Sequence, residues 1–406
     1  MRTTLAVIST CAVVSLLVFL SIFGNGGCAV ASNNLMSGAG IRESRLKPHG
    51  GTDNVNDAAF DAMFFRNYGV NPFVDTDEDH LSTFAIDVDT GSYTLCRSYL
   101  NRKHLPPKDA IRTEEFINYF DYGYSPPGEG KDAFRIHLEA APSLFGKDKI
   151  LLRVGIKARQ IAASDRKNAV LTFVIDTSGS MASEDRLELV KKSLRLLVDQ
   201  LREGDEVGIA VYGTRGRKLL AHCGIDNRKE ILDAIERLQP GGSTNAEEGL
   251  TIGYKMAKKA FKEGAINRIV LCSDGVANVG RTGPESILQA IKKHTAGGIT
   301  LSTIGFGMGN YNDVLMEQLA DKGDGNYSYV DTLREARRVF IENLTGTLQL
   351  VARDVKVQVD FDEAVVRSYR LLGYENRDVA DEDFRNDKVD GGEIGSGHSV
   401  TALYEL

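Results

Sequence analysis

The stretch FVIDTSGSM, residues 173–181, decides the fold of this 406-residue chain. An apolar run ends in Asp176, and hydroxyl residues then crowd around one glycine, at Thr177, Ser178 and Ser180. A short apolar run that ends in small polar residues is typical of a buried strand, and parallel sheets bind ligands where their strands end. The stretch therefore predicts a strand that delivers an acid and several hydroxyl groups to the edge of a sheet.

The section from residue 168 to residue 350 alternates apolar strands with amphipathic helices. We expect its strands at residues 171–176, 206–212, 268–273 and 300–305. Strand–helix alternation predicts an α/β fold, namely a doubly wound, mostly parallel, Rossmann-like sheet with helices on both faces.

The flanking segments have a different pattern. Residues 71–167 show alternating strands and some helix, and residues 351–406 return to strands. We expect the second segment to pack against residues 130–160 in one β-rich domain, with the α/β section inserted; two separate β units are the alternative. Residues 32–70 are rich in Gly, Asn, Ser and Asp, which is typical of a flexible linker.

A helix with a core-facing apolar side is expected between residues 106 and 120. Two prolines suit its start, and four apolar residues follow at helical spacing. These are Ile111, Phe116, Ile117 and Phe120.

The N-terminus predicts export. Residues 5–23 form an apolar-to-neutral run that is long enough to cross a bilayer. Ala29 and Ala31 fit the small-x-small rule for signal cleavage, whereas Cys28 lies in an imperfect lipoprotein box. Residues 1–31 are thus a cleaved signal, a lipid attachment site or a retained membrane anchor. Each places the body in the cell envelope, as a membrane-anchored, periplasmic or extracellular protein.

Composition argues against two classes of function, nucleic-acid binding and zinc binding. The formal net charge of -7 and the pI near 5.6 argue against a nucleic-acid partner. Cys272 lies inside an apolar strand and is expected to be a buried small residue, and no Cys/His spacing typical of zinc occurs.

Two more polar residues follow strands of the α/β section. Thr244 lies in the loop GGSTN before a helix, and Asp274 ends the apolar run IVLCSDG. Both are expected at the same sheet edge as Asp176. Two buried carboxylates repel one another, and a divalent cation removes that repulsion. Carboxylate and hydroxyl oxygens suit Mg²⁺ or Mn²⁺.

The ligand set indicates a bridge to another protein. Ser178, Ser180 and Thr244 are neutral ligands, so the cation keeps a charge deficit and an exchangeable position for a Glu or Asp of a protein partner. Hydrolysis would need a general acid or base near the metal. No histidine lies in the three loops, and Glu247 and Glu248 suit the first turn of a helix. We therefore expect no catalytic residue, organic cofactor or small-molecule substrate.

A basic hairpin tip is the candidate rim of the site. Arg215 and Arg217 follow the second strand and would attract an acidic partner, although a solvated, flexible hairpin explains them equally well. Asn245 is a weaker candidate for partner binding.

The pattern Asp176-x-Ser178-x-Ser180, then Thr244 and Asp274, resembles the metal-ion-dependent adhesion site (MIDAS) of von Willebrand factor type A domains. Longer stretches, including STFAIDVDTGSY, GGSTNAEEGL and GHSVTALYEL, are similar to the bacterial YfbK-type lipoprotein family. The resemblance implies that the hydroxyl residues bind metal directly and that the aspartates bind directly or through water. It also implies an exported, lipid-anchored protein whose flanking domain has no established activity.

The sequence thus predicts an exported module that binds a protein through Mg²⁺, for adhesion or assembly. The first alternative is an envelope scaffold whose metal is purely structural. The second is a metal-dependent hydrolase.

Overall fold

The computed structural model describes residues 63–406, apart from residues 67, 87–88, 129–131, 276–288, 290, 292, 296, 309–310, 343–345, 347, 378, 387–388 and 390. The predicted signal or anchor, residues 1–31, lies outside the described residues, as does most of the predicted linker. Within the described part, no helix is both long and apolar enough to cross a membrane.

The α/β section forms a six-stranded sheet in the order β12-β10-β9-β6-β7-β8. All neighbouring pairs are parallel except β7–β8, which is an antiparallel hairpin. The predicted mostly parallel, doubly wound fold is confirmed. The strands are β6 (Ala169–Asp176), β7 (Glu206–Tyr212), β8 (Arg217–Gly224), β9 (Ile266–Ser273), β10 (Ile299–Phe306) and β12 (Tyr327–Val330).

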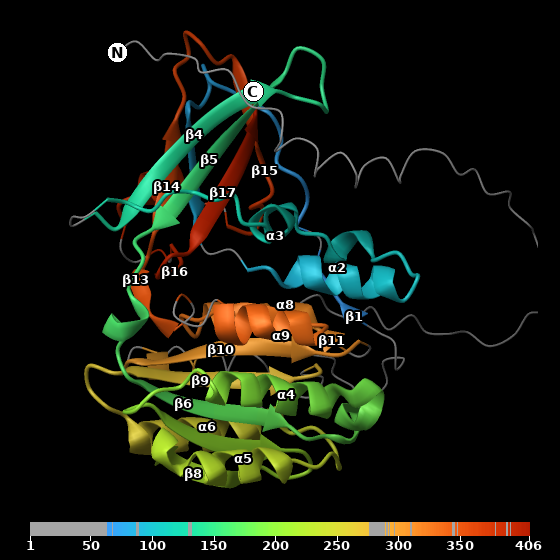
Figure 1. The fold of residues 1–406 in the computed structure, drawn as a ribbon. Helices are drawn as coiled ribbons and strands as arrows, with labels where there is room; N and C mark the ends of the chain where they lie inside the picture. Colours follow the sequence, from blue (N-terminus) through green and yellow to red (C-terminus); the bar gives the residue numbers. More distant parts are fainter. Residues whose placement is uncertain are drawn as a thin grey trace, which may run out of the picture. The chain divides into compact units, whose positions relative to one another are not determined.

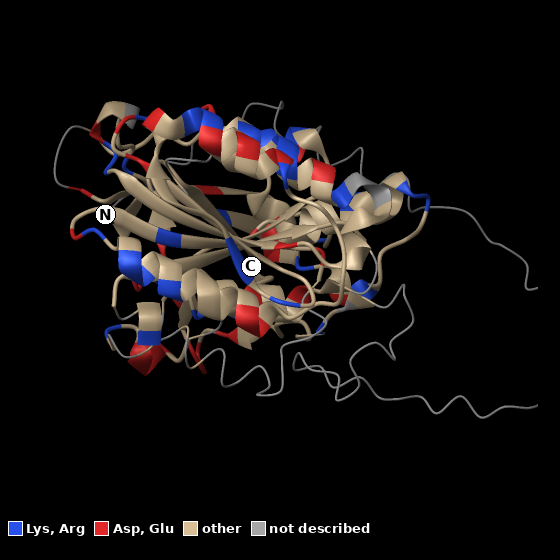
Figure 2. Ribbon diagram, turned by 90° about the horizontal axis from the view of Figure 1, so that it is seen from below, with Lys and Arg blue, Asp and Glu red and all other residues tan. Residues whose placement is uncertain are grey.

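Helices cover both faces of this sheet (Figure 1). On β6, Phe173 and Ile175 pack into one apolar cluster and Val174 into the other, as the two-residue period of a strand requires. The first cluster includes α4 (Arg186–Val198), α5 (Arg228–Glu236), α9 (Leu333–Arg337) and the π-helix η5 (Arg338–Glu342); the second includes α6 (Ala246–Ala260) and α8 (Asp313–Asp321). Figure 2 shows charged residues on the outer helices and few on the strands between them.

The flanking strands form a five-stranded sheet in the order β2-β15-β17-β5-β4. β17 lies between β15 and β5, so residues near the end of the sequence pair with residues that precede the α/β section. The strands are β2 (Val74–Asp75), β4 (Phe134–Pro142), β5 (Ile150–Ala158), β15 (Ser368–Leu372) and β17 (Ser399–Glu405). A separate pair, β3 (Leu81–Ala85) with β14 (Lys356–Asp360), shares an apolar cluster with this sheet.

Short elements complete the described chain. β13 (Leu350–Ala352) pairs with β16 (Ile394–Gly395). The described 3-10 helices are η1 (Lys108–Ala110), η2 (Ala163–Asp165), η3 (Gly179–Asp185), η4 (Ile225–Asn227) and η6 (Asp381–Asp383). β1 (Met63–Phe64) pairs with β11 (Tyr311–Asn312), so the end of the predicted flexible linker is bound to the α/β section.

The helix expected at residues 106–120 is shorter than predicted and broken. It divides into η1 (Lys108–Ala110) and α3 (Thr113–Asn118), because Arg112 between them is extended with φ -107° and ψ 112°. The expectation that the whole apolar stripe packs in the core is also wrong, since Ile111 and Phe120 are 47% and 49% exposed. A new helix, α2 (Gly91–Asn101), packs against β12 instead.

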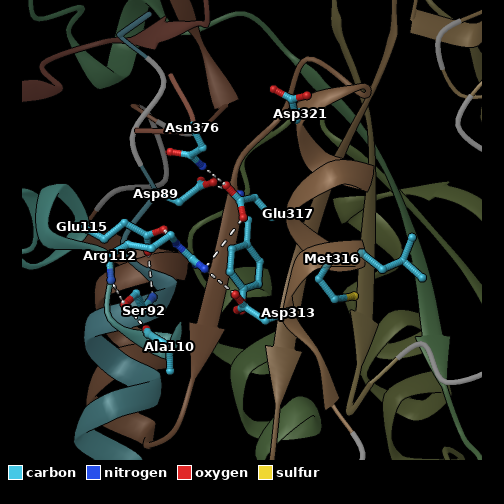
Figure 3. A network of polar contacts seen from close by, with 12 residues as sticks. Asp89, Ser92, Ala110, Arg112, Glu115, Asp313, Met316, Glu317, Asp321 and Asn376 are labelled. Atoms are coloured by element: carbon cyan, nitrogen blue, oxygen red, sulfur yellow. Dashed lines mark hydrogen bonds and ion pairs between the residues drawn. The ribbon is translucent and has the colours of Figure 1, made fainter. Parts of the chain in front are cut away.

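Arg112 is extended because its side chain organises a buried polar network (Figure 3). The guanidinium donates to Asp313 at 2.5 Å and also bonds Glu115, while the backbone N–H donates to Ser92 Oγ at 3.0 Å. Asp313 belongs to α8, so the network connects the segment before α3 with the α/β section. Removing one partner of the Arg112–Asp313 ion pair would leave the other as an unpaired buried charge.

Candidate metal-binding site

Asp176 ends the central strand β6 and is fully buried. One carboxylate oxygen accepts the backbone N–H of Ser178 at 2.8 Å, and the other accepts the Ser273 hydroxyl at 2.9 Å. The first bond closes a tight turn just before η3. Ser178 Oγ and Ser180 Oγ lie 3.0 Å apart.

Backbone bonds hold the Thr244 loop beside this turn. Gly241 N–H donates to Thr177 O at 2.7 Å, and Gly179 N–H donates to Gly242 O at 2.9 Å. Gly242 has φ +88°, a backbone conformation that favours glycine. The structure therefore brings the segment just before Thr244 against the Asp176 turn, and Thr244 itself is partly buried.

Asp274 follows β9, the neighbour of β6, and is also buried. Its carboxylate accepts a hydrogen bond from Arg186 Nη1 at 2.7 Å. Arg186 is itself buried and bonds the Met308 carbonyl oxygen as well. The guanidinium therefore offsets one of the two negative charges at this sheet edge, and the site as a whole is less acidic than two free aspartates.

The two carboxylates lie close enough to interact electrostatically. Burial and the Asp274 charge together raise the pKa of Asp176 to about 7. Burial also raises the pKa of Asp274, although hydrogen bonds from Ser180 and Arg186 oppose that change. A cation between them would stabilise both charged forms.

The basic hairpin tip lies over the Thr244 loop. Thr214 Oγ1 accepts the Ser243 N–H at 3.1 Å, and Gly216 N–H donates to Glu248 Oε2 at 2.8 Å. These bonds fix both ends of the tip, whereas the side chains of Arg215, in the loop before β8, and Arg217, the first residue of β8, are exposed.

Asn245 has a structural task. Its side-chain oxygen accepts the Glu248 N–H at 3.2 Å and caps α6. The Glu248 side chain also bonds Gly216, so it is engaged in holding the hairpin. Capping gives Asn245 a structural role, and its part in partner binding stays a prediction.

Three site residues were missed by the reasoning from sequence: Ser273, Tyr212 and Arg186. Ser273 immediately precedes Asp274 in SDG, and its hydroxyl was the available signal. Tyr212 ends β7, and its O–H pKa is raised well above its usual value by burial and by the Asp176 charge. Arg186 gave no signal, because an arginine at the start of an amphipathic helix normally faces solvent.

The donor set fits a small, hard divalent cation. Two carboxylates and nearby hydroxyl groups supply only oxygen atoms, as Mg²⁺ and Mn²⁺ prefer. Among the described residues, no group of three or more His, Cys, Asp or Glu side chains could hold a metal. A cation at this edge would therefore need the serine and threonine oxygens in addition to the two aspartates.

Three family models match the chain. A model of the von Willebrand factor type A domain matches residues 171–347, and one described as von Willebrand factor matches residues 59–153. A model described as the C-terminal part of uncharacterized protein YfbK matches residues 346–406. YfbK of Escherichia coli (strain K12) is 43% identical over 348 residues, which are 84% of this chain. This chain is a von Willebrand factor type A domain protein of the YfbK type.

Other matches of this YfbK-type chain are partial. It spans 60% of the length of Escherichia coli YfbK. Human inter-alpha-trypsin inhibitor heavy chain H3 is 29% identical over 171 residues, 40% of this chain and 19% of that protein. A solved von Willebrand factor type A protein from Catenulispora acidiphila has a TM-score of 0.43 at 16% sequence identity. The match covers 70% of this chain and 66% of the Catenulispora chain.

Proposed function

We propose that this YfbK-type chain binds another protein through a divalent cation held at the carboxyl edge of its α/β sheet. The ligands are Asp176, Ser178, Ser180, Thr244 and Asp274, and the cation is Mg²⁺ or Mn²⁺. When bound, the cation would offer one coordination position to a Glu or Asp side chain of the partner.

One observation above all supports this proposal: two buried aspartates meet hydroxyl groups at one sheet edge. Ser178 Oγ and Ser180 Oγ lie 3.0 Å apart, within one turn of Asp176. Desolvation makes metal-free, charged Asp176 unfavourable, so the edge is better suited to a cation than to two free carboxylates.

Arg186 supports a binding role for the site over a catalytic one. It neutralises Asp274, so a divalent cation beside Asp176 and Asp274 would keep a net positive charge that attracts an acidic partner. In the part of the chain that the structure describes, the side chains found to act on Asp176 and Asp274 include no histidine, and Glu248 is bonded to the hairpin. The chain's own residues would bind and orient, without transferring a proton.

The location follows from the N-terminal pattern. We propose that residues 1–31 direct export and that a lipid at Cys28 or an apolar anchor holds the protein at the membrane. The partner would then be a protein of the cell envelope. The alternative with a purely structural metal predicts that partner binding survives when the metal is removed and the fold is kept.

Titration calorimetry with Mg²⁺, Mn²⁺ and Ca²⁺ tests the metal site directly. We expect Mg²⁺ or Mn²⁺ to bind wild type, and Ser178→Ala to abolish binding. Ser193→Ala is the matched control, since that hydroxyl donates to Leu189 O inside α4 and should not affect the metal. Equal binding to wild type and Ser178→Ala would refute the ligand assignment.

Cross-linking in isolated envelopes tests the partner. We expect capture of a protein that is lost with EDTA and with Ser178→Ala. Arg215→Glu combined with Arg217→Glu should weaken capture yet leave Mg²⁺ binding unchanged. Capture that persists in EDTA would favour the scaffold alternative, and unchanged capture by the double variant would exclude the hairpin tip from the interface.

A further inference from the structure

The outer strand of the flanking sheet exposes apolar residues. β4 is the last strand in the order β2-β15-β17-β5-β4, and its Ile136 and Leu138 are 65% and 69% exposed. Their cross-strand neighbours on β5 are Ile156 and Val154, which are 5% and 3% exposed. Since opposite residues in a sheet point to the same face, the apolar face continues onto β4 and loses its cover there.

The cover that protects β5 comes from β3 and β14. Phe84 on β3 shares an apolar cluster with Val154, Ile156 and Tyr404. Ile136 and Leu138 do not belong to that cluster. Within the part of the chain that the structure describes, no strand pairs with the outer side of β4.

The backbone of β4 can accept another strand. Arg159 N–H donates to Ala133 O at 2.8 Å, and Ser143 N–H donates to Lys149 O at 2.7 Å, so odd-numbered residues bond toward β5. Bonding direction alternates along an antiparallel strand. The N–H and C=O groups of Ile136 and Leu138 therefore point away from β5.

The charges on β4 are complementary to β4 itself. Arg135, His137 and Glu139 occupy the other face of the strand. If two copies of β4 run antiparallel with His137 opposite His137, Arg135 of each copy faces Glu139 of the other. The same register places Ile136 opposite Leu138 and joins their outward backbone groups in hydrogen-bonded pairs.

This pairing would give Arg135 an oppositely charged neighbour. On its inner side, Arg135 lies opposite Lys157 of β5, which has the same charge and whose Nζ bonds Ser399 Oγ of β17. Glu139 of a second copy, which also forms an ion pair with Arg153 on its own β5, would bring a negative charge to Arg135 from the outer side. The central His137 would not obstruct the β4–β4 pair. Its ring stacks on Tyr124, with 5.0 Å between the ring centroids, and its Nε2 bonds Ser125 O.

The edges of the α/β sheet lack these properties. β8 begins with exposed Arg217 and Lys218, and charged residues discourage pairing at an edge. β12, at the opposite edge, is short and packs against α2. β4 is long, apolar on one face and self-complementary in charge on the other.

We propose that two copies of this chain associate through antiparallel β4–β4 pairing centred on His137, which makes one continuous sheet. This surface is separate from the metal site, so the inference is independent of the proposed function. Strand pairing alone forms a small interface, which predicts weak, reversible association. Anchoring at one membrane would promote it by raising the local concentration.

Two charge variants of the full chain test the register, with sedimentation equilibrium in a non-ionic detergent as the assay. In the proposed pair, Arg135→Glu sets two acidic side chains opposite one another, and Glu139→Lys sets two basic side chains opposite one another. Each variant alone should self-associate at least about tenfold more weakly than wild type, because two attractive pairs become repulsive. An equimolar mixture should recover association, since both pairs are then attractive.

Leu138→Lys is a second test that does not depend on charge pairing. Leu138 is exposed, so the variant should unfold at the wild-type temperature yet remain monomeric. A wild-type chain that stays monomeric at millimolar concentration would overturn the proposal and leave the strand to another protein or segment. Wild-type-like association of both charge variants would also overturn it, as would a mixture that associates no better than either variant.

Discussion

Asp176→Asn should stabilise the metal-free protein at alkaline pH, although it removes the central acid of the proposed site. Burial and Asp274 raise the pKa of Asp176 to about 7, so the folded protein holds this proton more tightly than the unfolded chain does. Asparagine keeps the oxygen that accepts the Ser178 N–H and carries no charge.

The size of the effect follows from the two pKa values. The unfolded value is about 3.9, and each unit of difference corresponds to about 1.4 kcal/mol, which gives roughly 4 kcal/mol. The sign follows from proton binding. A raised carboxyl pKa contributes stability that is fully present below pH ~4 and is lost as the pH rises to ~7. The asparagine variant has no proton to release and loses nothing over that window.

Urea unfolding in EDTA between pH 4 and pH 8 measures this difference. The free energies of unfolding of wild type and Asp176→Asn should be similar at pH 4 and should differ by up to about 4 kcal/mol at pH 8, with the variant more stable. At pH 8, Mg²⁺ at a hundred times its dissociation constant should stabilise wild type by about 2.7 kcal/mol and leave the variant unchanged.

Asp205→Asn is the matched control. Asp205 is as buried as Asp176, but its carboxylate accepts Arg166 Nη2 at 2.6 Å and Ala169 N–H at 2.7 Å. The same substitution there should destabilise by about 3 to 5 kcal/mol, because it strands a buried arginine. A pH-independent difference between Asp176→Asn and wild type, or a variant that is less stable at pH 8, would refute the reasoning.

Three further substitutions test the surroundings of the site and the buried network by thermal unfolding. Arg186→Met removes the guanidinium bonded to Asp274 and should destabilise the metal-free protein by about 3 to 5 kcal/mol. Mg²⁺ should restore part of this stability. No loss of stability would mean that the ion pair is dispensable. Gly307→Ala should destabilise by about 1 to 3 kcal/mol, because φ is +79° and the added Cβ would meet the Arg186 side chain; a neutral result would contradict the close approach. Arg112→Met should destabilise by about 3 to 5 kcal/mol by leaving Asp313 without its guanidinium, and a wild-type melting temperature would show that the network adds nothing.

The α/β fold was predictable from the sequence because each central strand is an apolar run bounded by polar residues. The break in the helix at residues 106–120 was harder to predict, because the apolar spacing indicates one continuous helix through Arg112. Arg112 takes an extended conformation so that its side chain reaches Asp313, and this divides the helix. The contact lies far away in the sequence, so the local sequence pattern does not predict it.

The residue types of the site were also predictable, since Asp176, Thr244 and Asp274 each follow a recognisable strand or precede a helix. The ligand set itself stays a prediction. The Arg186–Asp274 bond could not be predicted, because it joins residues 88 positions apart. Its existence depends on how α4 lies on the sheet, and a sequence pattern does not contain that placement.

The pairing of β17 between β5 and β15 has a consequence for synthesis. Lys157 Nζ bonds Ser399 Oγ although 242 positions separate them, so a ribosome makes the whole α/β section before β5 can meet β17. Contacts of such long range form slowly, and strand edges that wait for a partner are prone to aggregation. The flanking sheet can therefore be completed only after the α/β section has been made, and until then the side of β5 that pairs with β17 needs protection from other strand edges.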